Sequence, residues 1–271
     1  MGTKTVSFNP WVEGDLNFFQ FTGLTPEVLS ALEAAEAVIL PQTVSPEFYF
    51  FVRRLGKRVF PDYDLRFSFP GKIGQILLFK ALSLPHPETL CVPRICAFGP
   101  HPGAAEIRLP DPPFVVKGNH GHEGREIFLV ESPSDWEEAL SRLKAWEASG
   151  RFGFLIQEYL PWDYDLRVVV IGKRRLCFWR RGRFRKNLVQ EGEAAECPDA
   201  ELEARALSVV ERLCAASGLN LMAVDLLFRP ETGEVFLNEI NFVFGLRLIG
   251  GEERFRAYLS EAVAEFLKAN S

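Results

Sequence analysis

Two apolar runs joined by a short turn constrain the fold of this chain more than any other feature. Residues 222–228 read MAVDLLF and residues 234–241 read EVFLNEIN, with RPETG between them. Apolar runs joined by a short loop containing glycine predict a β-hairpin. A turn centred on Thr232 places Asp225 directly opposite Glu239, and Asn241 lies two residues further along on the same face.

This pairing predicts a metal site. Directly opposed side chains lie about 4.5–5.5 Å apart at Cβ, where two carboxylates repel each other. Their neighbours, including Val224 and Ile240, are apolar and exclude the water that would screen the repulsion. A divalent cation would resolve it, and two carboxylates with one amide oxygen are hard ligands suited to Mg2+ or Mn2+. Asp225, Glu239 and Asn241 are therefore candidate metal ligands; the alternative is a solvated strand face with a slipped register.

A lysine ends another apolar strand. The segment PFVVKG places Lys117 just before a loop that contains Gly118, Gly121 and Gly124. Glycines let backbone N–H groups approach phosphate oxygens, and the ammonium group supplies charge. The loop matches neither the Walker pattern nor the dinucleotide fingerprint. The hypothesis is a phosphate site; the alternative is an ordinary glycine turn after a strand.

Two further segments carry polar groups at strand positions. The apolar strand FLIQEYL ends in Gln157, Glu158, Tyr159 and Leu160, where exposed backbone could hydrogen-bond an adenine ring; an ordinary core strand is the alternative. The segment DLRVVVIG places Asp165 and Arg167 on one face of a strand. An arginine among Val and Ile needs an anionic partner or a polar cleft.

Positive charge is concentrated in one stretch. Residues 173–186 hold eight Lys and Arg residues and no acid, which leaves the rest of the chain at −13 against −5 overall. Three aromatic residues are interleaved with these cations, a pattern also found in nucleic-acid-binding proteins. A solvated strand edge guarded by basic residues is the simpler alternative.

The order of elements predicts an α+β or α/β architecture. The first 60 residues read as a small β-α-β-α unit, with helices starting beside Thr25 and Ser45. We expect three parts: an N-terminal α/β lobe, a middle part that begins with a connecting helix, and a C-terminal part that contains the hairpin. Their predicted bounds are 1–69, 70–155 and 156–271.

Composition narrows the class of protein. The hydrophobic share of 47% and charged share of 25% are those of a globular protein. No apolar run approaches the ~20 residues that cross a bilayer, and the N-terminus lacks the apolar core of a signal peptide. Five cysteines without a C-x-x-C pair indicate reduced thiols. We expect a cytoplasmic protein with no membrane partner; a homo-oligomer is compatible with the sequence.

These features, in this order, resemble the ATP-grasp family over about residues 70–250, and most closely its RimK-type and glutathione-synthetase-type carboxylate–amine ligases. PFVVKGNHGHEG is similar to the family's phosphate lysine and glycine-rich lid loop, QEYL to its adenine hinge, and VDLL with NEIN to its metal-binding strands. FRKNL resembles the segment whose Arg and Asn approach the phosphates, here Arg185 and Asn187. The resemblance implies a nucleotide cleft between two α+β subdomains, the lid subdomain at 70–155 and the metal-binding subdomain at 156–271. It also implies two groups of site residues: Arg167 and Arg185 for catalysis, and Lys117, Gly121, Gly124, residues 157–160, Asp165 and Asn187 for nucleotide binding.

The implied activity is ATP-dependent joining of a carboxylate to an amine or thiol through an acyl phosphate, with release of ADP and phosphate. ATP, Mg2+ or Mn2+, and small-molecule or peptide substrates are the implied ligands. The chain departs from the family after Leu188, where it reads VQEGEAAE, and after Asn241, where it reads Phe242-Val243-Phe244-Gly245. These departures leave open a nucleotide-binding module without catalysis, and the basic stretch leaves open a nucleic-acid-binding protein, which the acidic remainder of the chain disfavours.

Overall fold

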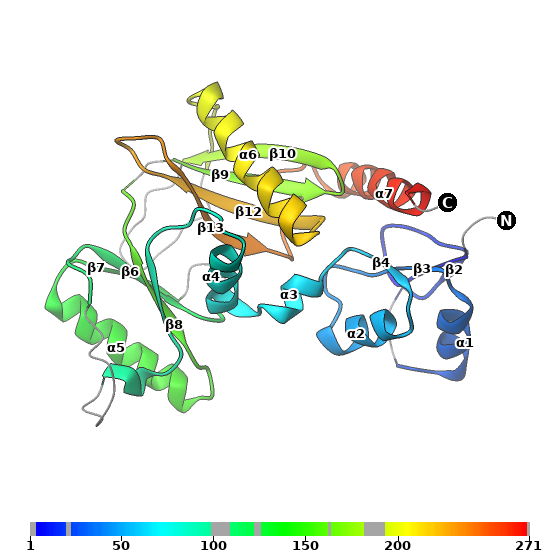
Figure 1. Cartoon of the computed structure of the whole chain (residues 1–271), viewed down its shortest axis with the longest axis horizontal. Helices are drawn as coiled ribbons and strands as arrows, with labels where there is room; N and C mark the ends of the chain where they lie inside the picture. Colours follow the sequence, from blue (N-terminus) through cyan, green and yellow to red (C-terminus); the bar gives the residue numbers. More distant parts are fainter. Residues whose placement is uncertain are drawn as a thin grey trace.

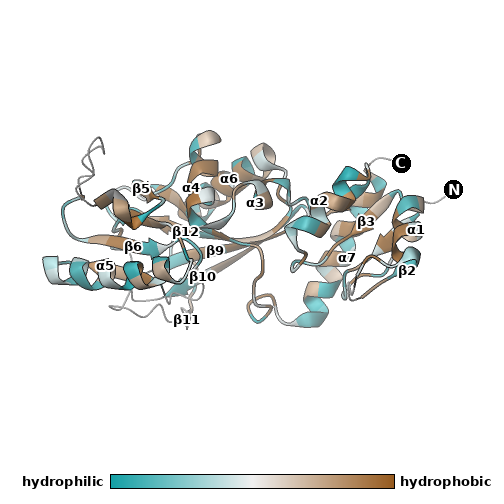
Figure 2. Ribbon diagram, turned by 90° about the horizontal axis from the view of Figure 1, so that it is seen from below, coloured by the Kyte–Doolittle hydropathy of each residue, from teal (hydrophilic) through white to brown (hydrophobic). Residues whose placement is uncertain are grey.

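The computed structural model describes residues 4–19, 23–98, 109–121, 126–161, 164–181 and 193–269. Within them the chain forms three sheets, arranged along an elongated molecule (Figure 2). Among the described residues no helix has the length and apolar character needed to span a membrane.

The N-terminal lobe is a parallel four-stranded sheet with the order β2-β1-β3-β4. Thr25 and Ser45 cap its two helices, because each side chain accepts a hydrogen bond from a backbone N–H in the first turn. The predicted β-α-β-α unit is confirmed, and the structure adds β2 and β4, of two and three residues. The elements are β1 (Thr5–Ser7), β2 (Leu16–Asn17), α1 (Pro26–Ala34), β3 (Ala37–Ile39), α2 (Pro46–Arg54) and β4 (Arg58–Phe60).

Two helices lead out of this lobe. The short α3 (Asp64–Ser68) comes first, and α4 (Gly71–Ala81) is the connecting helix expected at the start of the second part. Figure 1 shows α4 between the two remaining sheets, where it contacts strands of both. This position makes α4 the link between the halves of the site described below.

The lid subdomain is an antiparallel sheet with the order β5-β8-β6-β7, covered on one face by α5 (Figure 1). Ser132 caps α5 as its sequence predicts, accepting from the backbone N–H of Asp135. The elements are β5 (Thr89–Val92), the 3-10 turn η1 (Ile95–Phe98), β6 (Phe114–Gly118), β7 (Ile127–Val130), α5 (Pro133–Ala148) and β8 (Phe154–Glu158).

The C-terminal subdomain is an antiparallel sheet with the order β11-β10-β9-β12-β13, and α6 lies across one face of it (Figure 1). Gly218 ends α6 in the left-handed conformation, at φ 74°. The elements are β9 (Tyr164–Ile171), β10 (Arg174–Arg181), β11 (Glu193–Ala194), α6 (Ala200–Ser217), β12 (Leu221–Phe228), β13 (Val235–Asn241) and α7 (Glu252–Lys268).

Two hydrophobic cores hold the described residues together. One runs continuously from the N-terminal lobe into the C-terminal sheet, and the other lies inside the lid between α5 and its sheet. α7 helps to join the first core, since the Phe266 ring lies 5.7 Å from that of Phe60. The predicted boundary at 155/156 falls inside β8, which pairs with β5 and β6. A boundary after Glu158 follows the sheets more closely; the three-part division stays a prediction.

Candidate active site

The β12–β13 hairpin has the predicted register at its functional end. Asp225 pairs with Glu239 and Ala223 with Asn241, as a turn centred on Thr232 requires. The register then shifts between Asp225 and Leu226, so Asn238 is an extra residue on β13. Such a bulge re-aims the side chains around it, and the Asn238 side chain faces Lys117, as described below.

Asp225 is the centre of a charge network. Its carboxylate accepts two hydrogen bonds of 2.7 Å from Arg167, one of 3.0 Å from Arg180 and one of 3.0 Å from Asn241. Burial alone opposes ionisation, but hydrogen bonding from Arg167 and the charge of Arg180 outweigh it and hold the pKa of Asp225 below its usual value. Arg180 also binds Asp165, so these residues form one connected cluster.

Glu239 has its own cation. Lys72, from the first turn of α4, lies 2.6 Å from the Glu239 carboxylate and donates a second hydrogen bond of 3.0 Å to the carbonyl of Gly121. The expectation that the opposed carboxylates lack compensating charge is therefore wrong for this structure. Each of them is neutralised by basic residues from outside the hairpin.

Lys117 is buried at the end of β6 and faces the same cluster. Its ammonium group donates to Gln157 Oε1 at 2.6 Å and to Asn238 Oδ1 at 2.7 Å. Both acceptors are neutral, and burial lowers the pKa of Lys117 to about 8 although the charges of Glu239 and Asp225 oppose this. A buried cation without a carboxylate directly bonded to it can bind an anionic ligand, which supports the predicted phosphate role.

The loop after Lys117 is attached to α4. Asn119 caps this helix, with its carbonyl accepting from the N–H of Lys72 and its Oδ1 accepting from the N–H of Ile73, both at 2.9 Å. Gly71 makes room for this cap, since it has φ 71° and a Cβ there would lie 2.6 Å from Asn119 Oδ1. Further along α4, Gln75 pairs with both backbone groups of Ile240 on β13, each at 2.8 Å. α4 thus fixes the loop after Lys117 relative to β13.

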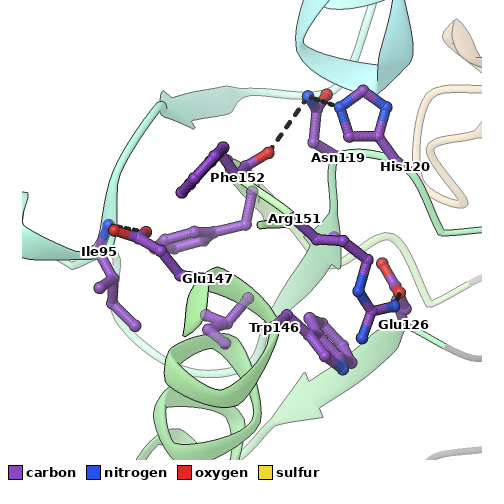
Figure 3. Close-up of a pocket in the computed structure, with 12 residues that line it drawn as sticks. Ile95, Asn119, His120, Glu126, Trp146, Glu147, Arg151 and Phe152 are labelled. Atoms are coloured by element: carbon purple, nitrogen blue, oxygen red, sulfur yellow. Dashed lines mark hydrogen bonds and ion pairs between the residues drawn. The ribbon is translucent and has the colours of Figure 1, made fainter. Parts of the chain in front are cut away.

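A shallow pocket lies on the other side of this loop, between Asn119, His120 and the end of α5 (Figure 3). Its charged groups are already paired: Arg151 with Glu126, and Glu147 with Arg94 and the N–H of Ile95. Lys117, Asp225 and Glu239 do not line it. The pocket therefore lies outside the predicted reaction centre.

Glu126 explains two of the loop's glycines. A Cβ on Gly121 would lie 2.5 Å from the Glu126 Cβ, and a Cβ on Gly118 would overlap the Glu126 carboxylate, which Arg151 holds in place. Packing against Glu126 therefore requires glycine at both positions. Their predicted role in letting phosphate approach remains a prediction.

We expect Gly118→Ala to lower the free energy of unfolding by about 1–3 kcal/mol, the usual cost of overpacking. Glu126→Ala in the same chain should recover much of that loss, because it removes the carboxylate that the new methyl group overlaps. Urea unfolding of both single variants and the double variant measures the coupling. Additive losses would show that Glu126 does not restrict Gly118.

The predicted adenine hinge is only partly free in this structure. The Gln157 side chain bonds to Lys117 and to Thr89. The N–H of Glu158 donates to the carbonyl of Glu88, and the Glu158 carboxylate pairs with Arg229 at 3.1 Å. Leu160 is buried. Adenine binding by residues 157–160 stays a prediction, and it would have to use groups other than the N–H of Glu158.

Most cations in the described part of the basic stretch form ion pairs within the protein. Lys173, Arg174 and Arg175 form ion pairs with Glu265, Glu261 and Glu211 on the adjacent helices. Arg180 lies inside the site, as described above. These pairings leave little free charge on the described part of the stretch for a nucleic acid. Gly124, Arg185 and Asn187, all predicted to bind or act on the nucleotide, lie outside the described residues.

The donor set fits a divalent cation of the Mg2+ type. The described residues contain no group of three or more His, Cys, Asp or Glu side chains suited to a metal. Asp225, Glu239 and the amide of Asn241 instead offer two carboxylates and one neutral oxygen, which suits hard cations that keep several waters. A bound cation would take over part of the neutralisation that Lys72, Arg167 and Arg180 now provide.

Comparison with known proteins agrees with this geometry. The sequence pattern of the RimK-like ATP-grasp domain matches residues 105–255, which include Lys117, Asp225 and Glu239. The chain belongs to the RimK-like ATP-grasp family. One relative of this family is a probable alpha-L-glutamate ligase of Xanthomonas oryzae pv. oryzae, 32% identical over 199 residues. That match covers 70% of this chain and 61% of the relative, so the chain spans less than two thirds of the relative's length. A probable alpha-L-glutamate ligase of Stenotrophomonas maltophilia is 31% identical, covering 68% of this chain and 60% of the relative.

Solved structures show the same fold. D-cycloserine synthetase DcsG is similar with a TM-score of 0.61 at 17% identity, covering 97% of this chain and 99% of that one. An L-amino acid ligase from Bacillus licheniformis is similar with a TM-score of 0.63 at 12% identity, covering 97% of this chain and 69% of that one. The predicted ATP-grasp fold is therefore confirmed.

Four residues that the sequence did not single out complete the site: Lys72, Gln75, Arg180 and Asn238. Lys72 and Gln75 come from a helix far from the hairpin in sequence, so no local pattern connects them to it. Arg180 did carry a signal. A two-residue turn at Gly172-Lys173 pairs Arg180 with Asp165, as β9 and β10 do.

Proposed function

We propose that this chain is an ADP-forming carboxylate–amine ligase. The observation that carries the proposal is that Arg167, Arg180 and Asn241 bind Asp225 and Lys72 binds Glu239. Lys117 lies beside them and bonds to Asn238, the neighbour of Glu239. Cations and hard oxygen ligands in one place suit a nucleotide triphosphate with its metal. Membership of the RimK-like ATP-grasp family supports the same reaction class.

In the proposed reaction a substrate carboxylate oxygen attacks the γ-phosphorus of ATP, and the bond to the β,γ-bridging oxygen breaks. ADP leaves, and an acyl phosphate forms. An amine then attacks the acyl carbon, loses a proton and displaces phosphate. Mg2+ held by Asp225, Glu239 and Asn241 would neutralise phosphate charge when bound.

The protein's own groups position and stabilise these charges. Lys117 is held at a fixed point by Gln157 and Asn238, so its ammonium group is preorganised for a phosphate oxygen. Arg167 lies bidentate on Asp225 and can present its charge to the transferred phosphoryl group. Preorganised charge and alignment supply most of the acceleration in phosphoryl transfer.

Glutamate is the first substrate to test, since the two ligases compared above carry it in their names. The test is ADP release from MgATP with pairs of amino acids, peptides and dicarboxylic acids. Stimulated release of ADP and phosphate supports the proposal. AMP and pyrophosphate would indicate an adenylating enzyme, and nucleotide binding without turnover for any pair would indicate a module that has lost catalysis.

We expect Glu239→Gln to raise the Mg2+ concentration that half-saturates ADP release by about tenfold or more, the effect of losing about 1.4 kcal/mol of binding free energy. The reason is that an amide oxygen replaces one of two ionised ligands. Glu234→Gln, at the exposed end of the hairpin, is the matched control. An unchanged Mg2+ requirement in Glu239→Gln would refute the metal assignment.

A further inference from the structure

The N-terminal lobe presents the edge of its sheet that usually binds ligands. Its four strands are parallel, and in open α/β sheets ligands bind outside the carboxyl ends of the strands. Here that edge meets the segment that follows β13. Gln42, after β3, donates to the carbonyl of Phe242 at 3.1 Å, and the ring of Tyr63, after β4, lies 5.5 Å from that of Phe242. Phe242 directly follows the candidate metal ligand Asn241, so this edge borders the proposed reaction centre.

Arg66, on α3, lies at this junction. Its Nη1 donates to the backbone carbonyl of Gln42 at 2.6 Å. Its guanidinium carbon lies 4.5, 4.9 and 5.0 Å from the rings of Tyr63, Phe67 and Phe242. Burial lowers the pKa of Arg66, which reflects the loss of water around a permanent cation.

No ion pair joins Arg66 to a carboxylate in the described part of the chain. The acids beside it are engaged elsewhere: Asp64 accepts two hydrogen bonds from Arg53, and Asp62 accepts from the N–H of Asp64. Besides the carbonyl of Gln42 and the three aromatic faces, the Tyr63 hydroxyl is a hydrogen-bond partner of Arg66. These partners are all uncharged and still leave several of the guanidinium's five N–H donors for an anion.

The other half-buried arginines in the described part of the chain all have a source of negative charge. Arg167, Arg175, Arg180 and Arg229 pair with carboxylates, and Arg58 binds the carbonyl of Phe266 near the C-terminal end of α7, where the helix dipole is negative. Arg66 lies in the last turn of α3, but this helix of five residues has only a small dipole, and no carboxylate among the described residues pairs with Arg66. A partly desolvated guanidinium of this kind matches a planar anion that accepts two hydrogen bonds, and a carboxylate is such an anion.

We propose that Arg66 binds a second, non-reacting carboxylate of the substrate, seated between the carboxyl edge of the N-terminal lobe and residues 242–245. This inference rests on the proposed function and narrows its substrate to an amino acid or dicarboxylic acid that keeps one carboxylate free. The chain's departure from the family at Phe242-Val243-Phe244-Gly245 lies against the same junction, where Val243 is 57% exposed.

The test is calorimetric binding in the presence of saturating MgADP. The probes are L-glutamate, L-aspartate and glutarate, each compared with its mono-amides. Wild type should bind at least one acid about 10- to 100-fold more tightly than a mono-amide, the range for a charge-assisted hydrogen bond. Arg66→Met should lose that discrimination, Arg66→Lys should keep part of it, and Arg53→Met, at an exposed pair, should keep it all.

MgATP binding is measured on every variant. A substitution that damages the fold would weaken the binding of both MgATP and the acid. Arg66→Met that binds MgATP normally and still discriminates acid from amide overturns the inference. A wild type that distinguishes none of the acids from their amides overturns it too. Failure of the proposed function has a different signature: acid–amide discrimination that depends on Arg66, with no release of ADP from MgATP for any substrate pair.

Discussion

Asp225→Asn is expected to reduce ADP release by about 100- to 1000-fold, the usual effect of removing one strong electrostatic element from an active site. The same change should lower the free energy of unfolding of the ligand-free protein by about 3 kcal/mol. The reason is that breaking a buried ion pair from one side leaves the other charge buried without compensation. Here two guanidinium groups, Arg167 and Arg180, would lose that compensation.

This expectation reverses the one that the hairpin alone suggests. Two opposed carboxylates repel, so neutralising one of them would leave the protein as stable or slightly more stable. The structure reverses the expected change in the free energy of unfolding. The Asp225 side chain is only 10% exposed and is bound by Arg167, Arg180 and Asn241. Its attraction to these groups outweighs its repulsion by Glu239.

Urea unfolding and ADP release measure the two effects separately. Asp64→Asn is the matched control, since Asp64 also pairs bidentately with an arginine but at 39% side-chain exposure. A pair exposed to that degree contributes about 1 kcal/mol or less. Equal stability of Asp225→Asn and wild type would show that the arginines do not depend on Asp225.

The hairpin shows how far sequence reasoning reaches. The two-residue period of a strand and the length of the turn were enough to oppose Asp225 and Glu239, and the structure confirms it. The bulge at Asn238 lies where β13 meets Lys117 from another sheet, and the two-residue period of the strand does not predict it. Sequence reasoning is reliable here where the determinants are local.

The sequence does not predict which basic side chains neutralise Asp225 and Glu239. Lys72 reaches Glu239 from a helix 167 positions away in the chain, and its sequence context is only that of a helix start. The sequence presents the arginines of β10 as one basic stretch, although strand alternation places Arg180 and the exposed Arg181 on opposite faces. Which cation meets which carboxylate follows from how the three sheets pack together, and that is tertiary information.

Lys117→Met should have the other large effect. We expect MgATP binding to weaken by about 10- to 100-fold, because a hydrogen bond from a charged donor contributes roughly 1.5–3 kcal/mol. Calorimetry with MgATP measures it, and Lys144→Met, at an exposed position on α5, controls for the loss of one lysine. Unchanged MgATP affinity would remove Lys117 from the phosphate site.

The same variant tests the state of the buried ammonium group. Lys117 has a pKa of about 8 in the folded protein, against about 10.4 for an unfolded chain. Below pH 8 both states carry the charge, and the folded state bears the full burial cost. Between about pH 8 and 10.4 the unfolded state binds more protons, so the Lys117 contribution to the free energy of unfolding rises with pH, by about 3 kcal/mol in total.

The measurable quantity is the difference in unfolding free energy between wild type and Lys117→Met, because cysteines and tyrosines that titrate in the same range cancel in it. As the pH rises from about 8 to 10.4, the free energy of unfolding of wild type should rise by about 3 kcal/mol relative to that of Lys117→Met. Saturating MgATP should suppress this gain, since phosphate oxygens favour the charged ammonium group. The MgATP affinity of wild type should correspondingly fall as the pH rises above about 8. A difference that stays constant with pH would mean that the Lys117 ammonium group is as well solvated in the folded protein as in the unfolded chain. Burial against the neutral acceptors Gln157 and Asn238 would then not lower its pKa.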